Sequence, residues 1–266
     1  LHAPTSGTVA GIEFIPGAMG IMVEAVSIDA DGEDTWGELP PPIDWKNASA
    51  DELKKRICDS GIVGMGGAAF PSHVKLSPPP DKKVDTLILN GAECEPYLTA
   101  DHRLMLEQPE KVLEGAAILA KAAGVTEIAI GVENNKPDAI AALEAVADKY
   151  GVKVKALRVK YPQGAEKQLI YAITGRKVPA GALPMDCGCV VQNVGTAAAV
   201  TDAVPTFDAS DERFMARGDM PARIAILLPA PKPPLRDARI SRTRWPAPQP
   251  RSAIACSSSD AEPSPL

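Results

Sequence analysis

Hydrophobic and polar residues follow regular periods between residues 84 and 160. Apolar residues recur at three- and four-residue spacing after Pro109, with Val112, Leu113 and Ala116 on one face, which is typical of an amphipathic helix. The same criteria predict strands over 84–90, 127–132 and 152–157 and helices over 109–123 and 137–150. Because strand and helix alternate, we expect an α/β domain whose parallel strands are joined by helices.

The first 45 residues have the pattern of a small β unit. Short apolar runs predict strands over 7–9, 12–15, 21–23 and 25–28, followed by an acidic turn and a stiff connector at prolines 40–42. Ser49 precedes Asp51 and Glu52, a signature of a helix N-terminus, and we expect that helix to run to about Ser60. A module boundary therefore falls near residue 45.

The composition changes abruptly toward the C-terminus. From Pro221 onward, 10 of 46 residues are Pro, and Arg replaces Lys almost completely. Such a segment cannot bury enough apolar surface to offset the entropy of ordering, so we expect disorder, and the swing from Lys to Arg also fits a frame-shifted end. Three parts result: a β module with its linker (1–45), an α/β domain (46–204) and a tail (205–266).

Composition and charge exclude several classes of protein. The chain has 266 residues, of which 45% are apolar and 23% charged, as in a folded globular protein. Its net charge of -6 offers no general attraction to nucleic acid, and without a run of roughly 20 apolar residues we expect no direct membrane insertion. The chain begins at Leu1 rather than Met, which indicates a missing start. Its five scattered cysteines favour a reducing compartment.

A glycine-rich stretch carries the most specific local pattern. Gly61, Gly64, Gly66 and Gly67 lie within seven positions, and Lys75 follows them. Glycines let the backbone approach a ligand and present N–H groups to an anion, and the lysine adds a positive charge. The spacing matches neither the dinucleotide-binding nor the P-loop signature, so a phosphate cradle and a purely structural loop both remain open.

A second cluster follows the strand over 84–90. Asn90, Glu93, Cys94 and Glu95 belong to the sequence NGAECEP, at the carboxyl end of a strand, where ligands bind in open α/β sheets. The glutamates could accept hydrogen bonds from ribose hydroxyls or an amide, or they could form a solvated acidic loop. We expect Cys94 to be a small buried residue rather than a nucleophile.

Other polar residues are expected to have structural roles, and no catalytic acid, base or metal-ligand set is expected. These residues are Cys187, Cys189, His73, His102 and the basic group Lys153, Lys155, Arg158 and Lys160.

Four motifs, in their order along the chain, resemble those of the RnfC family, the C subunits of the Rnf-type ion-translocating electron-transport complex. They are GMGGAAFP with its following lysine, NGAECEP, YPQGAEKQ and QNVGTA. The resemblance covers residues 1 to about 203, and the central domain is similar in turn to the NADH-binding flavoprotein subunit of respiratory complex I. It implies a Rossmann-like domain that binds FMN and NADH, preceded by the second half of a lipoyl-like β module.

The resemblance implies roles for ten residues. Gly64, Gly66 and Lys75 match a loop that holds the flavin phosphate and ring edge. The others match flavin and nucleotide contacts (Asn90, Glu93, Glu95), the nicotinamide side of the site (Gly164, Glu166) and flavin-phosphate contacts (Asn193, Thr196). Met65, Ala92 and Ala165 depart from the complex I pattern, which has Arg, Asp and Glu there.

The resemblance further implies a peripheral subunit on the cytoplasmic side of the bacterial inner membrane. Electrons would pass from NADH to FMN, then to [4Fe–4S] clusters and partner subunits, although the sequence lacks the Cys-x-x-Cys-x-x-Cys-x-x-x-Cys-Pro runs that ligate these clusters in the family. The alternative is a non-catalytic docking or assembly module of the same complex. A soluble NAD-dependent dehydrogenase fits less well because no GxGxxG follows a strand.

Overall fold

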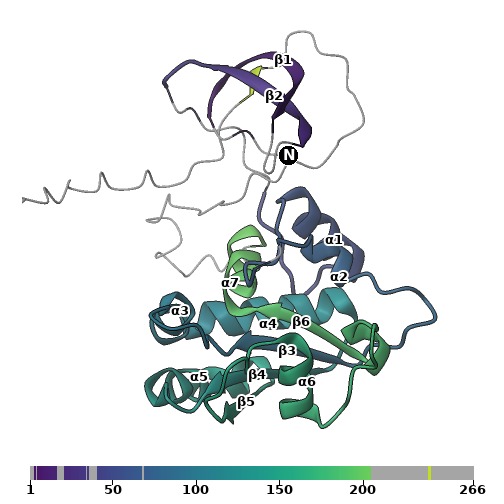
Figure 1. Ribbon diagram of the computed structural model, residues 1–266, viewed down its shortest axis with the longest axis vertical. Helices are drawn as coiled ribbons and strands as arrows, with labels where there is room; N and C mark the ends of the chain where they lie inside the picture. Colours follow the sequence, from purple (N-terminus) through teal and green to yellow (C-terminus); the bar gives the residue numbers. More distant parts are fainter. Residues whose placement is uncertain are drawn as a thin grey trace, which may run out of the picture.

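The computed structural model describes residues 3, 5–16, 21–33, 35, 41–67, 69–204 and 239–240 (Figure 1). Its larger part is an α/β unit built on four strands: β3 (Thr86–Gly91), β4 (Glu127–Glu133), β5 (Val152–Leu157) and β6 (Cys189–Asn193). All neighbouring pairs are parallel, and the strand order is β5-β4-β3-β6. The α/β class expected from the periodicity is confirmed.

Helices cover both faces of this sheet. The larger core lies between the sheet and α1 (Ala50–Asp59), α3 (Ala100–Glu107), α4 (Pro109–Ala123), α5 (Pro137–Tyr150) and α7 (Val194–Ala203). A smaller core packs α6 (Glu166–Thr174) against the opposite face. Two short helical turns, α2 (Ser72–Lys75) and η2 (Pro184–Cys187), complete the unit.

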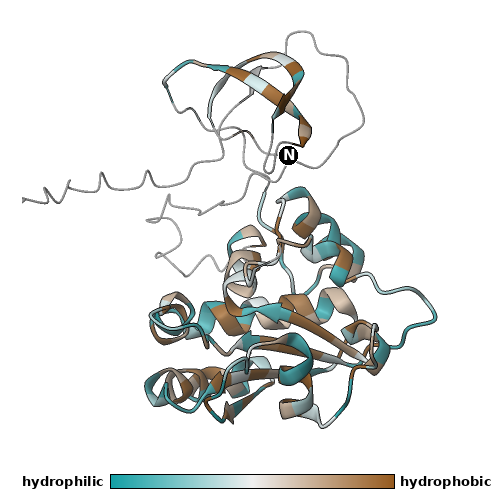
Figure 2. Ribbon diagram, viewed as in Figure 1, coloured by the Kyte–Doolittle hydropathy of each residue, from teal (hydrophilic) through white to brown (hydrophobic). Residues whose placement is uncertain are grey.

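Side chains alternate between the two cores along each strand. On β3, Leu87 and Leu89 belong to the larger core, whereas Ile88 packs with Leu169 and Ile170 of α6. Figure 2 shows the resulting apolar colouring along the strands and helices of the unit. A sheet buried on both faces needs apolar residues at successive positions, which explains why β3 and β4 have continuous apolar runs instead of strict alternation.

Helices α4 and α7 approach each other closely at Gly115. A Cβ atom at this position would lie 1.9 Å from the carbonyl oxygen of Ala197. The Thr201 hydroxyl donates to the Lys111 carbonyl oxygen at 2.7 Å, and the Lys111 Nζ pairs with Asp202 at 2.6 Å. The absence of a side chain at Gly115 therefore allows α7, which follows β6, to dock on α4.

The helix predicted after Ser49 is confirmed as α1. Ser49 is its N-cap, and the Ser49 Oγ accepts from the Glu52 backbone N–H at 3.3 Å. The Glu52 carboxylate accepts in return from the Ser49 backbone N–H at 2.7 Å, which completes a capping box. Helix α1 leads directly into the glycine-rich stretch.

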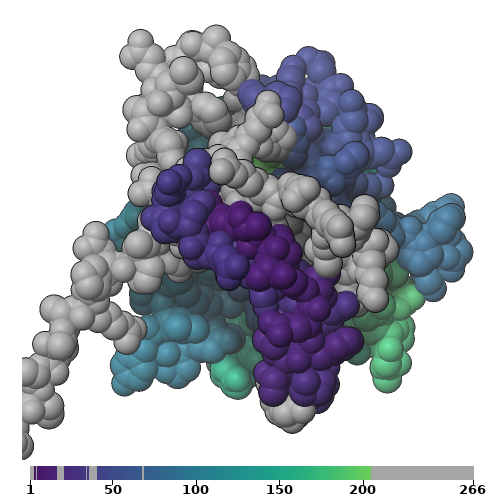
Figure 3. Space-filling view, turned by 90° about the horizontal axis from the view of Figure 1, so that it is seen from above, coloured from purple at the N-terminus to yellow at the C-terminus, as the bar shows by residue number. Residues whose placement is uncertain are grey.

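A β-hairpin precedes the α/β unit. Strands β1 (Gly7–Pro16) and β2 (Met22–Ala30) pair antiparallel, so the four short strands expected over residues 7–28 are two longer ones. Pairing continues past the single irregularity between Val9 and Gly11, which is why no breaks form within the strands. Figure 3, seen from above, shows this hairpin in purple on one face of the molecule. How much of a lipoyl-like module it represents stays a prediction.

The C-terminal tail expected at 205–266 lies outside the described residues except for β7 (Arg239–Ile240), which pairs antiparallel with β1. The module boundaries near residues 45 and 204 stay predictions. No helix in the described part of the chain is long and apolar enough to cross a membrane.

We predict that Gly115→Ala strongly destabilises the α/β unit. The new methyl group would meet a backbone carbonyl at 1.9 Å, so we expect the upper end of the overpacking range, about 3 kcal/mol or more. Urea unfolding followed by circular dichroism measures the loss. Gly11→Ala is the control, because a Cβ there meets no atom within 4 Å; an equal loss in both variants would contradict the α4–α7 contact as the cause.

Candidate functional site

A cavity of about 760 Å³ opens at the carboxyl ends of β3 and β6. These two neighbours mark the point where the strand order reverses, because β4 and β5 extend the sheet to one side of β3 and β6 lies on the other. Ligands of open α/β sheets bind at such switch points. Nine of the ten residues singled out in the sequence line the cavity: Gly64, Gly66, Lys75, Asn90, Glu93, Glu95, Gly164, Glu166 and Asn193.

Thr196, the tenth residue, is fully buried and does not line the cavity. Its Oγ1 accepts a hydrogen bond from the Met65 backbone N–H at 2.9 Å. Thr196 therefore holds the glycine loop, residues 61–67, against the first turn of α7. A Cβ on Gly66 would lie 3.2 Å from the Asn193 Cβ, so this contact leaves little room for a side chain.

Asn193 is the N-cap of α7 and uses both ends of its amide within the protein. The Oδ1 accepts from the backbone N–H of Gly195 at 2.7 Å and of Thr196 at 3.4 Å. The Nδ2 donates to Asp101 Oδ2 at 2.7 Å. Asn193 thus fixes the helix end and the glycine loop, and Asp101 fixes the orientation of its amide.

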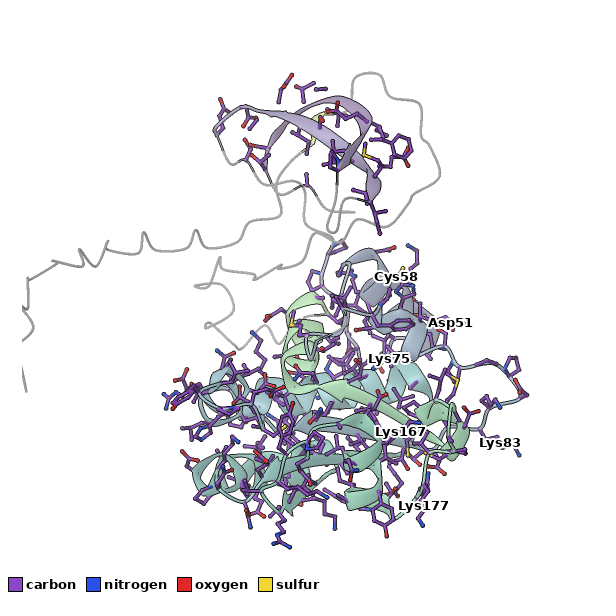
Figure 4. All side chains as sticks on the ribbon, in the orientation of Figure 1. Asp51, Cys58, Lys75, Lys83, Lys167 and Lys177 are labelled. Atoms are coloured by element: carbon purple, nitrogen blue, oxygen red, sulfur yellow. The ribbon has the colours of Figure 1, made fainter. Side chains whose placement is uncertain are left out.

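Lys75 joins three parts of the site. Its Nζ lies 3.2 Å from Glu166 Oε1, at the start of α6, and 3.2 Å from the Val191 carbonyl oxygen in β6. Figure 4 labels Lys75, the last residue of α2, within the α/β unit. The Lys75 side chain is only partly exposed, and these two acceptors hold its ammonium group at the cavity wall.

The turn after β3 packs tightly on the segment 161–166. The Asn90 Nδ2 donates to the Gly164 carbonyl oxygen at 2.8 Å, and the Asn90 Oδ1 accepts from the Ala92 N–H at 3.1 Å. A Cβ on Gly164 would come within 2.5 Å of the Ala92 carbonyl oxygen. The glycine is therefore required by close backbone contact, independently of any ligand.

Glu93 caps helix α3. Its two carboxylate oxygens accept from the backbone N–H groups of Asp101 at 3.0 Å and His102 at 3.1 Å. The buried Lys136 donates to the Glu93 carbonyl oxygen at 3.1 Å and to Glu133 Oε2 at 3.1 Å. Lys136 thus holds the turn after β3 in place through its bonds to Glu93 and Glu133. Cys94 lines the cavity and is only half-buried, so the expectation of a buried residue is wrong there: it lies in the turn that follows the end of β3 at Gly91.

Three polar residues of the site are not among the ten candidates, namely Asp101, Lys136 and Gln192, although Gln192 begins the QNVGTA motif. Gln192 lines the cavity and is 2% exposed, yet neither atom of its amide has a hydrogen-bond partner among the described residues. A polar residue at the end of the apolar strand CVVQN was a detectable signal. An unpaired buried amide is costly, which indicates that Gln192 is arranged for a polar ligand.

The cavity wall carries more negative than positive charge. Four of its described residues are acidic (Glu93, Glu95, Asp101 and Glu166), and one is basic, Lys75. Burial raises the pKa of Asp101, and the nearby carboxylates of Glu93 and Glu95 raise it further, whereas the Asn193 hydrogen bond and Lys136 oppose the shift. No group of three or more His, Cys, Asp or Glu side chains in the described part of the chain is placed to hold a metal ion.

The remaining candidates do not line the cavity. His102 Nε2 lies 2.8 Å from Asp138 Oδ1 near the protein surface, and Lys153 pairs with Glu127 on neighbouring strands. Cys189 is buried at the start of β6, where desolvation, with the neighbouring Cys187, raises its pKa to about 12. A thiol of that kind remains protonated and unreactive at neutral pH.

Comparison with known proteins identifies the family. The profile of the Nuo51 FMN-binding domain matches residues 57–202, the span that contains the sheet and all four motifs. The chain therefore belongs to this family of flavoprotein-type α/β domains. Its fold is similar to a chain of an NAD+-reducing [NiFe]-hydrogenase in the H2-reduced state, with a TM-score of 0.54 and 24% identity over 64% of this chain and 35% of the other.

The relatives are C subunits of ion-translocating complexes. The chain is 54% identical over 208 residues to the C subunit of the Na(+)-translocating ferredoxin:NAD(+) oxidoreductase complex of Acetobacterium woodii. It is 53% identical to the C subunit of the proton-translocating complex of Clostridium ljungdahlii and 48% identical to that of the ion-translocating oxidoreductase complex of Pseudomonas aeruginosa. Each match covers 77% of this chain but 47%, 45% and 27% of these relatives, respectively, so the chain spans less than half of their length.

We predict that Gln192→Leu stabilises the ligand-free protein. Replacing an unpaired buried amide with an apolar side chain of similar size removes a desolvation penalty of about 1 to 3 kcal/mol, of which we expect about 1 kcal/mol to be recovered. Thermal unfolding in ligand-free buffer measures the change. Gln168→Leu, at an exposed position of α6, is the control and should change stability by less than about 0.5 kcal/mol. A loss of stability in Gln192→Leu would show that the amide is satisfied within the protein.

Proposed function

We propose that the cavity binds FMN together with a nicotinamide dinucleotide, and that this chain forms the flavin-bearing part of an electron-transfer subunit in an ion-translocating membrane complex. One observation carries the proposal: four motifs, separated by up to about 130 residues in the sequence, line or brace one cavity at the switch point of the sheet. The names of the matched family and relatives, which include FMN-binding and ferredoxin:NAD(+) oxidoreductase, support it.

The cavity has properties that suit a flavin nucleotide. Its volume of about 760 Å³ lies within the usual range for ligand sites, roughly 300 to 1,000 Å³. The unpaired amide of Gln192 can donate to and accept from a polar ligand, such as a ribityl chain or a flavin ring edge. The glycine loop lies against the first turn of α7, where backbone dipoles favour an anion.

The residues divide into two groups in this proposal. Gly64, Gly66 and Lys75 would hold the flavin, with Asn193 and Thr196 keeping the glycine loop and α7 in place around its phosphate. Asn90, Glu93, Glu95, Gly164 and Glu166 would shape the side of the cavity that admits the dinucleotide. Met65, Ala92 and Ala165 supply no charged group there, so orientation of the dinucleotide would rest on the remaining polar residues.

The bound flavin would supply the hydride- and electron-transfer chemistry. The chain's own residues would bind, orient and desolvate the reactants, and no side chain need act as an acid or base. Lys75 is already oriented by Glu166 and the Val191 carbonyl oxygen, so it would reach an anionic or carbonyl group with little loss of side-chain entropy. [4Fe–4S] clusters, which the sequence resemblance implies for the family, and partner subunits would receive or deliver the electrons.

The proposed location follows from the relatives. A C subunit of an ion-translocating complex works at a membrane, and we propose that this chain attaches there peripherally, on the cytoplasmic side, through partner subunits.

A second candidate function, a non-catalytic docking module, draws support from the hairpin. There the apolar side chains of Phe14, Ile21 and Met22 are 67%, 63% and 53% exposed.

We predict that Lys75→Met weakens FMN binding by about 10- to 100-fold, because a hydrogen bond to a charged group contributes about 1.5 to 3 kcal/mol. Titration of the purified chain with FMN, followed by quenching of flavin fluorescence, measures the affinity. Lys83→Met is the matched control, because Lys83 carries the same charge but is labelled at the edge of the unit in Figure 4 and does not line the cavity.

Each result of this titration has a distinct meaning. A loss confined to Lys75→Met supports the flavin site. Equal losses of affinity in both variants would attribute the effect to the loss of one positive charge rather than to the position of Lys75. Equal binding by wild type and Lys75→Met would place the lysine away from the flavin. If the folded wild-type chain does not bind FMN, the docking-module alternative replaces the proposal.

A further inference from the structure

The carboxylate of Asp101 lies near the N-terminus of α7, the helix end whose dipole favours an anion. Asp101 lines the cavity, and its Oδ2 lies 2.7 Å from the Asn193 Nδ2. A Cβ built on Gly195, in the first turn of α7, would lie 3.8 Å from Asp101 Oδ1 and 3.6 Å from the Met65 sulfur. The acid, the helix end and the glycine loop therefore meet in one corner of the cavity.

The charges around this corner are predominantly negative. Glu93 and Glu95 lie in the turn after β3, and Glu166, which pairs with Lys75, also lines the cavity. Lys136, which precedes α5, is the cation that acts on Asp101, but its Nζ is committed to Glu133 and to the Glu93 carbonyl oxygen. A phosphate group entering this corner would meet an ionised Asp101 at short range in a partly desolvated site, where like charges repel strongly.

We propose that Asp101 is a positioning residue that orients the Asn193 amide, and that its carboxylate takes up a proton from solvent when a flavin phosphate occupies the cavity. This inference rests on the proposed flavin function. The proton binds a carboxylate oxygen of Asp101, and no bond in the flavin changes. The other oxygen remains an acceptor for the Asn193 Nδ2, so protonation removes the charge while the cap of α7 stays in place.

Three observations support this assignment over a purely structural acid. Burial, with Glu93 and Glu95 nearby, already raises the pKa of Asp101 in the ligand-free protein, and an added anion would raise it further. The Asn193 amide has its orientation fixed from both ends, so Asp101 controls which atom faces the helix. The unpaired Gln192 amide in the same cavity indicates that a polar ligand belongs there.

The test compares FMN with riboflavin, which has the same ring and ribityl chain but no phosphate, between pH 6.5 and 8.5. Because the FMN complex would hold one more proton than the free protein, we expect FMN affinity to fall as pH rises, by up to tenfold per pH unit. Riboflavin affinity should not fall. Calorimetry at pH 7 in buffers of different ionisation enthalpy measures proton uptake directly, and we expect it with FMN only.

Two variants separate charge from positioning. Asp101→Asn keeps an acceptor for Asn193 but removes the charge, so it should bind FMN about tenfold more tightly than wild type at pH 8, without proton uptake. Asp101→Ala removes the acceptor as well and should bind less tightly than Asp101→Asn. Asp51→Asn, on the exposed start of α1 (Figure 4), is the matched control and should behave as wild type.

Ligand-free stability gives a readout that does not depend on FMN. Because the folded pKa of Asp101 is raised above its unfolded value, the protein loses stability as pH rises through that folded pKa. Asp101→Asn should therefore have a higher melting temperature than wild type at pH 8, and the difference should disappear below the unfolded pKa of an aspartate.

The outcomes distinguish this inference from the flavin proposal. FMN binding whose affinity is independent of pH, with no proton uptake, would overturn the role of Asp101 and leave the flavin site intact. Equal binding by Asp101→Ala and Asp101→Asn would overturn the positioning role. If neither wild type nor Asp101→Asn binds FMN at any pH, the flavin proposal fails and this inference fails with it.

Discussion

The pairing of β6 with β3 is the interaction on which the rest of the site depends. Strands β3, β4 and β5 extend the sheet in one direction, and the chain then returns past α6 to add β6 on the other side of β3. The segments that leave β3 and β6 diverge, because β3 leads into the turn that carries Glu93 and Glu95, whereas β6 leads into α7. The space between them becomes the cavity, and the glycine loop and segment 161–166 form its walls.

Most polar groups around this cavity are already bonded to the protein. Glu93 caps α3, Asn193 caps α7, and Lys75 is held between Glu166 and β6. These bonds fix the orientation of the side chains before a ligand binds, so binding requires less rearrangement. Gln192 is different, because its buried amide has no partner within the described structure. The site thus combines a rigid frame with one group whose hydrogen bonds remain to be made.

The same frame creates an electrostatic conflict for an anionic ligand. Backbone dipoles at α7 and the ammonium group of Lys75 attract a phosphate, whereas Glu93, Glu95 and Asp101 repel it. Lys136 compensates only in part, because it is buried beneath the turn and paired with Glu133. Protonation of a single buried carboxylate is a small change that resolves the conflict without moving the backbone.

Much of the fold could be predicted because its signals are local. Helices α4 and α5 and strands β4 and β5 have strong periodicity, and the Ser49 cap identified the start of α1. The local patterns divide the hairpin strands too finely, and they do not predict α3, α6, β6 and α7. These elements are short, and motif residues such as Gln192, Asn193 and Gly195 interrupt their apolar patterns. Tertiary packing stabilises them where local propensity is weak.

The sequence by itself determined the α/β class, the ten candidate residues and the resemblance to a flavoprotein family. Only the tertiary structure decided which of those residues face the cavity, that Thr196 braces the glycine loop from behind, and that Asp101, Lys136 and Gln192 belong to the site. The physical reason is that a motif specifies which side chains its own segment carries, whereas strand order and helix docking decide which other segments those side chains contact. Lys75 and Glu166 are 91 positions apart, and they meet because β6 pairs with β3 and α6 crosses the opposite face of the sheet.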